Sequence, residues 1–76
     1  MDRKQKYVRL AQHNNIIIFP TTIDHSDFKH MNPVSAGFCY VDENKVSCFG
    51  ESFTLQMKSH NDDSMYATHQ LFGFDI

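Results

Sequence analysis

The sequence is poor in the residues that several protein classes require. It has no tryptophan, two cysteines, two prolines and three glycines among 76 residues. Two cysteines are too few for a disulfide-stapled secreted scaffold, and three glycines leave little material for a phosphate-binding loop. The longest apolar run, Ile16–Phe19, is far below the ~20 residues of a membrane span. No apolar stretch follows the starting residues MDRKQK, so we expect no secretory signal, a cytoplasmic location and no membrane partner.

Positive charge is scarce outside the first nine residues. The net charge is −2, but residues 1–9 carry +3 and the remainder carries −5. The basic residues of this first segment are Arg3, Lys4, Lys6 and Arg9. We expect residues 1–5 to form a flexible basic arm, which is either simply solvated or touches phosphate or an acidic partner. An acidic body argues against a dedicated nucleic-acid binder.

What the chain does contain is a globular composition, with 41% hydrophobic and 13% aromatic residues. Residues 6–12 alternate and predict a strand, with Val8 and Leu10 on one side. The pair Asn14-Asn15 predicts a tight turn into a returning strand over Ile16–Phe19. Residues 21–32 predict a short helix, capped by Thr21 with Asp24 and ended by Asn32-Pro33.

The second half of the chain repeats this plan without repeating its residues. Residues 34–41 and 46–55 predict two strands, and a second helix is expected from Asn61 to Gly73. The expected apolar stripe of that helix consists of Met65, Thr68, Leu71 and Phe72. The order is ββαββα, which predicts a single α+β domain over residues 1–76, with a four-stranded, mainly antiparallel sheet and two helices.

The segment GFCYVDENKVSCFG, residues 37–50, reads almost the same from either end. Pairing Val41 with Val46 places Cys39 opposite Cys48 and Phe38 opposite Phe49, which predicts a hairpin in a defined register. One face of this hairpin then carries only small side chains and suits a closely packed helix. The other, bulky face carries Phe38, Tyr40, Phe49, Phe53 and Leu55.

The bulky face needs cover from a helix, a second protomer or a ligand. Its candidate binding residues are Phe38, Tyr40, Phe49 and Phe53. The leading prediction is a small, soluble, non-enzymatic protein that acts as a protein–protein interaction or regulatory module, with a homodimer as one form of it. The alternative is single-stranded nucleic-acid binding, because aromatic side chains on an open sheet can also stack nucleobases.

Cys39 and Cys48 admit three interpretations. We expect two buried thiols that act as small hydrophobic side chains in a reducing compartment. A redox switch is the second alternative, since opposed cysteines can be close enough to bond at a non-hydrogen-bonded pair. No metal site is expected, because neither a Cys-x-x-Cys motif nor a closely spaced histidine supplies further ligands.

The remaining polar residues show no complete catalytic pattern. His25 and His30 fall on opposite sides of a helix, and His69 lies at the edge of the second helix's stripe. His60 with Asp62 and Asp63 forms either a loose metal site or a helix cap. Adjacent helical residues diverge, so the run Asp24-His25-Ser26-Asp27 is no triad, and no nucleophile elbow or zinc-protease motif is present. We expect no enzyme activity and no cofactor.

Overall fold

The computed structural model describes residues 4–73 of the chain. Six strands, two 3-10 helices (η) and one α-helix follow one another within these residues. Their order and bounds are β1 (Lys4–Leu10), η1 (Gln12–Asn14), β2 (Ile16–Phe19), η2 (His25–Met31), β3 (Pro33–Val41), β4 (Val46–Phe49), β5 (Glu51–Ser52), β6 (Met57–Lys58) and α1 (Asp63–Phe72).

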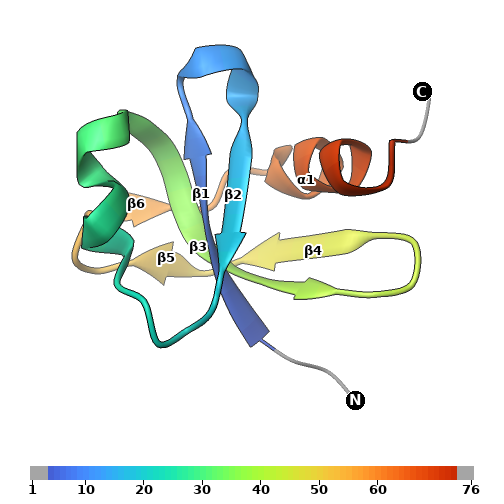
Figure 1. Ribbon diagram of the computed structural model, residues 1–76, viewed down its shortest axis with the longest axis horizontal. Coiled ribbons are helices and arrows are strands. Elements are labelled where there is room, and N and C mark those ends of the chain that lie inside the picture. The colour runs from blue at the N-terminus through green and yellow to red at the C-terminus, as the bar shows by residue number, and fades with distance from the viewer. Residues whose placement is uncertain (1–3, 74–76) are drawn as a thin grey trace.

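The main sheet has four antiparallel strands in the order β2-β1-β3-β4, and β5 and β6 form a separate two-stranded sheet. The elements η2 and α1 lie on opposite sides of β1 and β2 (Figure 1). The predicted α+β fold with a four-stranded antiparallel sheet is therefore confirmed. The helices differ from the prediction, because the first is a 3-10 helix.

The mirrored segment forms the β3–β4 hairpin in the predicted register. Phe38 pairs with Phe49, Cys39 with Cys48 and Val41 with Val46. Glu43 and Asn44 connect the strands, and the Asp42 amide donates to the Lys45 carbonyl across the turn at 2.8 Å. The symmetric sequence thus specifies which residues share a face, as a side-chain period of two requires.

The predicted strand over residues 46–55 is wrong beyond Phe49. Gly50 has a φ of +80°, a left-handed conformation that suits glycine, and it ends β4. Close packing reinforces this break, because a Cβ on Gly37 would lie 2.4 Å from the Phe49 carbonyl oxygen. Phe53 and Leu55 therefore leave the hairpin's bulky face and belong to the β5–β6 connection.

Two local predictions in the first half also need correction. The left-handed residues of the β1–β2 connection are His13 and Asn14, with φ of 60° and 53°, whereas Asn15 is extended. The 3-10 helix η2 begins at His25, and its N-cap residue Asp24 makes no side-chain capping bond, so the capping pair of Thr21 with Asp24 is not formed. The predicted end is confirmed, since Asn32 takes a left-handed conformation before β3.

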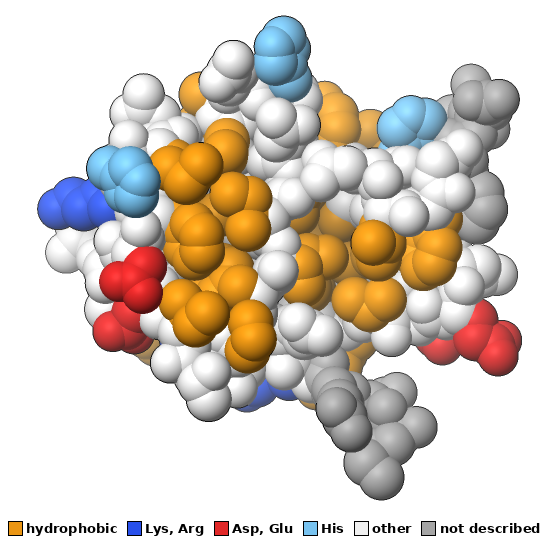
Figure 2. Space-filling view, in the orientation of Figure 1, with side chains coloured by type: hydrophobic (Ala, Val, Ile, Leu, Met, Phe, Trp, Pro, Cys, Tyr) orange, Lys and Arg blue, Asp and Glu red, His pale blue; other side chains and the backbone are white. Residues whose placement is uncertain are grey.

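The core consists of two clusters built from alternate residues of β1. Tyr7 belongs to the cluster beneath α1, with Ile16, Cys39, Val46 and Ala67. Val8 belongs to the cluster on the opposite side, with Leu10, Phe19 and Ala36. Hydrophobic side chains also gather at two places on the surface in Figure 2, one between η2 and β2 and one between β4 and α1. The sheet is therefore apolar on both faces, although each face is closed differently.

The helix α1 packs through only part of the predicted stripe, since Thr68 and Phe72 are partly buried and Phe72 packs against the Tyr7 cluster. Met65 and Leu71 are 48% and 51% exposed, whereas Asp63 and Ala67 are buried. Small Ala67 lets the helix approach the sheet, and polar side chains on either side of it reach the strands. Gly73, in a left-handed conformation with its amide bonded to the His69 carbonyl, ends the helix as predicted.

These polar side chains bind the backbone of both edge strands. Val46 donates its amide to Thr68 Oγ1 at 2.8 Å, and the same hydroxyl donates to the Val46 carbonyl at 3.2 Å. Cys48 donates its amide to Ser64 Oγ at 2.8 Å. On the opposite edge, the Gln70 side-chain amide accepts from the Ile16 amide and donates to the Ile16 carbonyl. The helix thus satisfies edge groups of β4 and β2 that are otherwise open to another strand.

Candidate functional site

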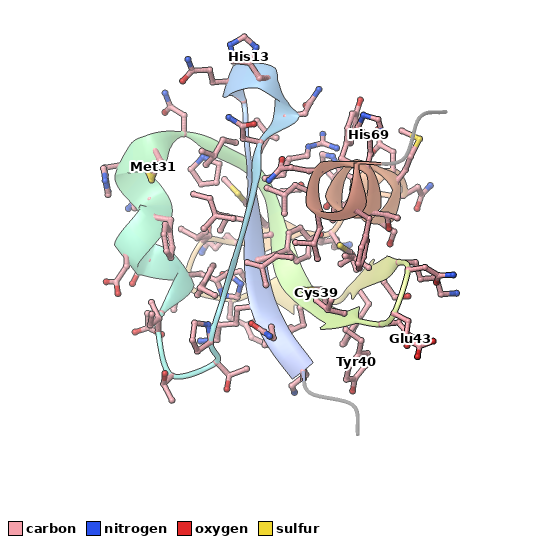
Figure 3. The ribbon with its side chains drawn as sticks, turned by 45° about the vertical axis from the view of Figure 1, so that its right-hand side comes forward. His13, Met31, Cys39, Tyr40, Glu43 and His69 are labelled. Carbon is pink, nitrogen blue, oxygen red and sulfur yellow. The ribbon has the colours of Figure 1, made fainter. Side chains whose placement is uncertain are left out.

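Three aromatic side chains form a row on the hairpin face opposite α1. Phe38 and Tyr40 flank buried Cys39 on β3, and Phe49 lies across from Phe38 on β4. The Phe49 ring centroid lies 6.2 Å from that of Phe38 and 5.3 Å from that of Tyr40, with interplanar angles of 30° and 22°. Tyr40 and Phe49 remain 40% and 37% exposed, and Tyr40 points away from α1 (Figure 3). We call Phe38, Phe49 and Tyr40 the aromatic row.

Two lysines of β1 share this face because of the strand register. Lys4 is directly opposite Tyr40, and Lys6 is opposite Phe38. The Lys4 ammonium lies 4.8 Å from the Phe38 ring centroid, within cation–π range. Lys6 Nζ donates to the Ile23 carbonyl at 2.9 Å and lies 3.9 Å from an Asp24 carboxylate oxygen. The charge of Lys6 is thus already engaged within the protein.

The predicted basic arm does not act as one unit. Lys4 belongs to β1, and Arg9 is buried on the opposite face of the sheet. Arg3 lies outside the described residues. The structure therefore brings two of the four predicted basic residues, Lys4 and Lys6, to the aromatic row.

A buried histidine supports the row from below. His25 is 4% exposed, and its Nε2 donates to the Gly37 carbonyl at 2.8 Å. Its ring meets those of Phe19 and Phe38 edge-on. Burial lowers the pKa of His25 below its ordinary value, and the Lys6 charge acts in the same direction. The imidazole is therefore neutral at pH 7 and serves as a packed, hydrogen-bonded part of the core.

Phe53 stands beside the row rather than in it. It occupies the turn between β5 and β6 and is 83% exposed, the most exposed large hydrophobic side chain among the described residues. The turn is held by bonds from the Leu55 amide to Ser52 Oγ and from the Gln56 amide to the Phe53 carbonyl. A hollow of about 150 Å³ lies next to it, with Phe38, Phe53, Lys6, Asp24 and Glu51 among its lining residues.

Cys39 and Cys48 are opposed at a non-hydrogen-bonded pair, because the Cys48 amide donates outward to Ser64. Both are free thiols. Burial raises the pKa of Cys39 to about 11 and that of Cys48 to about 12. Thiols with such pKa values are protonated at pH 7 and react slowly. The strand register places the two cysteines directly opposite each other, whereas protonation of both thiols disfavours their oxidation.

A buried polar cluster joins β1 to the start of α1. The Asp63 side chain, fully buried, accepts from Arg9 Nη1 at 2.9 Å, from the His60 amide at 2.9 Å and from the Tyr7 hydroxyl. Arg9 Nη1 also contacts Asp62 at 3.0 Å. Burial, followed by the bond to Asp63, raises the pKa of Tyr7 and keeps its hydroxyl protonated. Sequence reasoning missed Tyr7 and Arg9 as partners of Asp63.

The same cluster contains His60, Asp62 and Asp63, which the sequence indicated as either a loose metal site or a helix cap. Ligand atoms of His60, Asp62 and Asp63 lie within 4.8 Å of one another. The Arg9 guanidinium, however, bonds both carboxylates and approaches His60 Nδ1 at 3.2 Å. A metal ion would have to displace this charge or stand beside it. The arrangement therefore fits a salt-bridged joint better than a metal centre.

The other histidines and the side chains of the Asp24-His25-Ser26-Asp27 run are mostly exposed. Only His25 of that run is buried, and the other three side chains are exposed. His30 is exposed at the end of η2, and His69 is exposed on α1 (Figure 3). The expectation that His25 and His30 do not converge on one ligand agrees with this arrangement.

Within residues 4–73, no helix has the length and apolar character needed to cross a membrane. No protein-family model matches the chain, and no curated protein and no solved structure matches it either.

Proposed function

We propose that the protein is a non-enzymatic binding module that recognises another protein through the aromatic row and Phe53. The observation that carries the proposal is the exposed aromatic area, with Tyr40 and Phe49 more than a third exposed and Phe53 largely exposed. Aromatic side chains supply large contact areas at low entropic cost and dominate binding energy at protein interfaces. A rigid hairpin and a braced turn present these rings in fixed positions.

The charges around the row favour a protein over a nucleic acid. Lys4 and Lys6 are balanced on this face by Asp24 and Glu51, so a polyanion would meet charges of both signs. The rings also cover one another's faces, since neighbouring rings are inclined by only 22° and 30°. A nucleobase needs a free ring face, whereas apolar side chains of a protein can pack on exposed ring edges.

The proposed partner is a protein in a reducing compartment such as the cytoplasm, which suits two free thiols, one buried and one partly buried. A homodimer through the same row is one form of the proposal. Sedimentation at several protein concentrations distinguishes it, because a dimer that uses the row dissociates in the Phe49→Ala variant and persists in Met65→Ala.

The test compares capture of host proteins by the wild type and by surface variants. We expect a protein that survives nuclease treatment to be retained by wild type and lost with Phe53→Ala and Phe49→Ala. Leu71→Ala is the matched control, because Leu71 is an exposed apolar residue on α1. Equal capture by all variants would remove the aromatic surface from the binding site.

Single-stranded nucleic-acid binding is the second candidate, favoured by one observation. Lys4 lies over the Phe38 ring and opposite Tyr40, so a cation adjoins the exposed rings. Binding of this kind weakens steeply as salt concentration rises. We expect a labelled oligonucleotide to show at most weak binding, equally reduced by Lys4→Gln and by added salt. Tight, salt-sensitive binding that Tyr40→Ala abolishes would place this candidate first.

A further inference from the structure

A hollow on the described part of the chain lies away from the aromatic row. It has a volume of about 470 Å³ and is formed where the end of η2 and the start of β3 meet the β5–β6 hairpin. The 3-10 helix η2 and the β5–β6 hairpin lie on the side of the sheet opposite α1 (Figure 1). Pockets that bind small molecules typically have ~300–1,000 Å³. The hollow is thus large enough for a small organic ligand.

Its lining combines an apolar part with exposed polar side chains. Pro33, Leu55 and Met57 supply the apolar surface, and Leu55 and Met57 also pack against the core cluster around Val8. Lys29 is the single charged residue of the lining. Its ammonium makes no hydrogen bond or ion pair within residues 4–73, unlike the ammonium of Lys6 on the same side of the sheet.

The polar part also includes Thr54, whose hydroxyl lies 3.3 Å from Ser52 Oγ, and two amide side chains, those of Asn32 and Gln56. Neither is engaged in a side-chain hydrogen bond with another described residue. Lysine offers three donors and no acceptor, and each amide offers two donors and one carbonyl acceptor, so donors outnumber acceptor oxygens and the lining lacks any carboxylate. An anionic oxygen acceptor attached to an apolar group complements such a lining.

We propose that this pocket binds a small carboxylic acid whose apolar body rests on Pro33, Leu55 and Met57 while its carboxylate pairs with Lys29. Asn32 and Gln56 donate to the remaining carboxylate lone pairs. The inference uses neither the aromatic row nor Phe53, and it is independent of protein binding there.

The test is an NMR titration of the ¹⁵N-labelled full chain with three probes. The first is 3-phenylpropionate, the second is its neutral amide and the third is acetate, so that charge and apolar body are separated. We expect saturable shifts at the amides of residues 54–57 with 3-phenylpropionate. The neutral amide and acetate should each bind about threefold more weakly or worse, as an exposed ion pair and a modest apolar contact imply.

Two variants fix the role of the lysine. Lys29→Met keeps an apolar stem and should weaken 3-phenylpropionate about threefold. Lys45→Met, at the exposed β3–β4 turn, is the matched control and should leave the affinity unchanged. The dispersion of the amide spectrum shows that each variant is folded.

Three outcomes would overturn the proposal. They are an absence of saturable shifts at residues 54–57, equal affinity for the acid and its amide, and equal affinity of the wild type and Lys29→Met. A blocked Leu-Asp-Leu peptide that binds more tightly than 3-phenylpropionate would also overturn it, because the pocket would then recognise an acidic protein side chain.

Discussion

The two faces of the main sheet are closed by different kinds of interaction. On one face, α1 is held by hydrogen bonds to both edge strands and by the buried Asp63–Arg9 pair. On the other, η2 and the β5–β6 hairpin cover Val8 and Phe19 through apolar contacts and leave the aromatic row partly open. The difference follows from side-chain size, because small residues let a helix come close enough for its polar groups to reach the strands. Hydrogen bonds at both edges close the first face. The second face is closed mainly by apolar contacts, with a buried hydrogen bond from His25 to the Gly37 carbonyl, and it leaves ring area exposed.

The largest expected effect comes from removing the buried ion pair between Asp63 and Arg9 on the α1 side of the sheet. Asp63→Ala leaves Arg9 buried without its main partner, and we expect a loss of about 3–5 kcal/mol in the free energy of unfolding. Asp62→Ala is the control, because the Asp62 side chain is 51% exposed and should cost at most about 1 kcal/mol. Urea denaturation of both variants measures the difference. Equal losses would show that burial of Asp63 is not what holds α1.

A smaller effect is expected from removing one edge bond. Thr68→Val keeps the shape of the side chain but deprives the Val46 amide and carbonyl of their partner, and we expect a loss of about 1 kcal/mol. Thr22→Val, at an exposed loop position, should be neutral. If the two variants unfold at the same urea concentration, water replaces the Thr68 hydroxyl without loss of stability, and these hydrogen bonds do not stabilise the β4 edge.

A third effect, the loss of stability on protonation of His25, appears only at acidic pH and concerns the η2 side of the sheet. The pKa of His25 in the folded protein is below the ordinary value of 6.5, so the unfolded chain binds its proton first as the pH falls. Stability should be unaffected by this group above pH 6.5 and should decline as the pH drops toward the lowered folded pKa. Lys6 and Asp24 act on the same ring, and Lys6→Met is expected to lessen the decline.

Thermal unfolding of the wild type and of His25→Gln between pH 7.5 and 5 provides the measurement. The variant should start lower, because its contacts with Phe19 and Phe38 are lost, but it should show a flatter pH dependence. Parallel curves for the two proteins would assign the acid sensitivity to other groups.

The smallest expected effect sharpens the difference between supporting and exposed rings. Phe53→Ala should change the free energy of unfolding by no more than about 0.5 kcal/mol, since the ring is 83% exposed. Phe38→Ala should cost more, because Phe38 is half-buried and contacts His25 and Phe49. A large loss in Phe53→Ala would mean that this ring stabilises the fold, and it would no longer qualify as a surplus binding surface.

The sequence predicted the elements whose signals are local. The mirrored hairpin was recovered with its register, because alternation at a period of two leaves one arrangement that separates Cys39 and Cys48 from Phe38 and Phe49. Gly73 marked the end of α1 for a similar reason, since glycine adopts the left-handed conformation at little cost. The exposure of Tyr40 and Phe49 shows that the bulky face is not wholly core, a question that the sequence left open.

The long-range polar contacts were beyond such reasoning. Tyr7 and Arg9 meet Asp63 across more than fifty residues, and no local pattern pairs them. The available signal was the alternation in β1 of Val8 and Leu10 with Tyr7 and Arg9. The side chains of Tyr7 and Arg9 can be buried when a carboxylate accepts hydrogen bonds from them. The break at Gly50 was missed because continued alternation into Phe53 and Leu55 resembled a longer strand. Met65 and Leu71 were wrongly predicted to face the sheet, because hydrogen bonds from polar side chains of α1 to the edge strands also orient the helix.

The attachment of α1 also sets an order of events during synthesis. Every strand of the main sheet precedes α1 in the chain, so a ribosome delivers β2 and β4 before the helix that caps them. Until residues 63–72 emerge, the amides of Ile16, Val46 and Cys48 have no side-chain acceptor, and the nascent sheet carries two open borders. Residues 63–72 therefore supply edge hydrogen bonds that the strands of the main sheet cannot make among themselves.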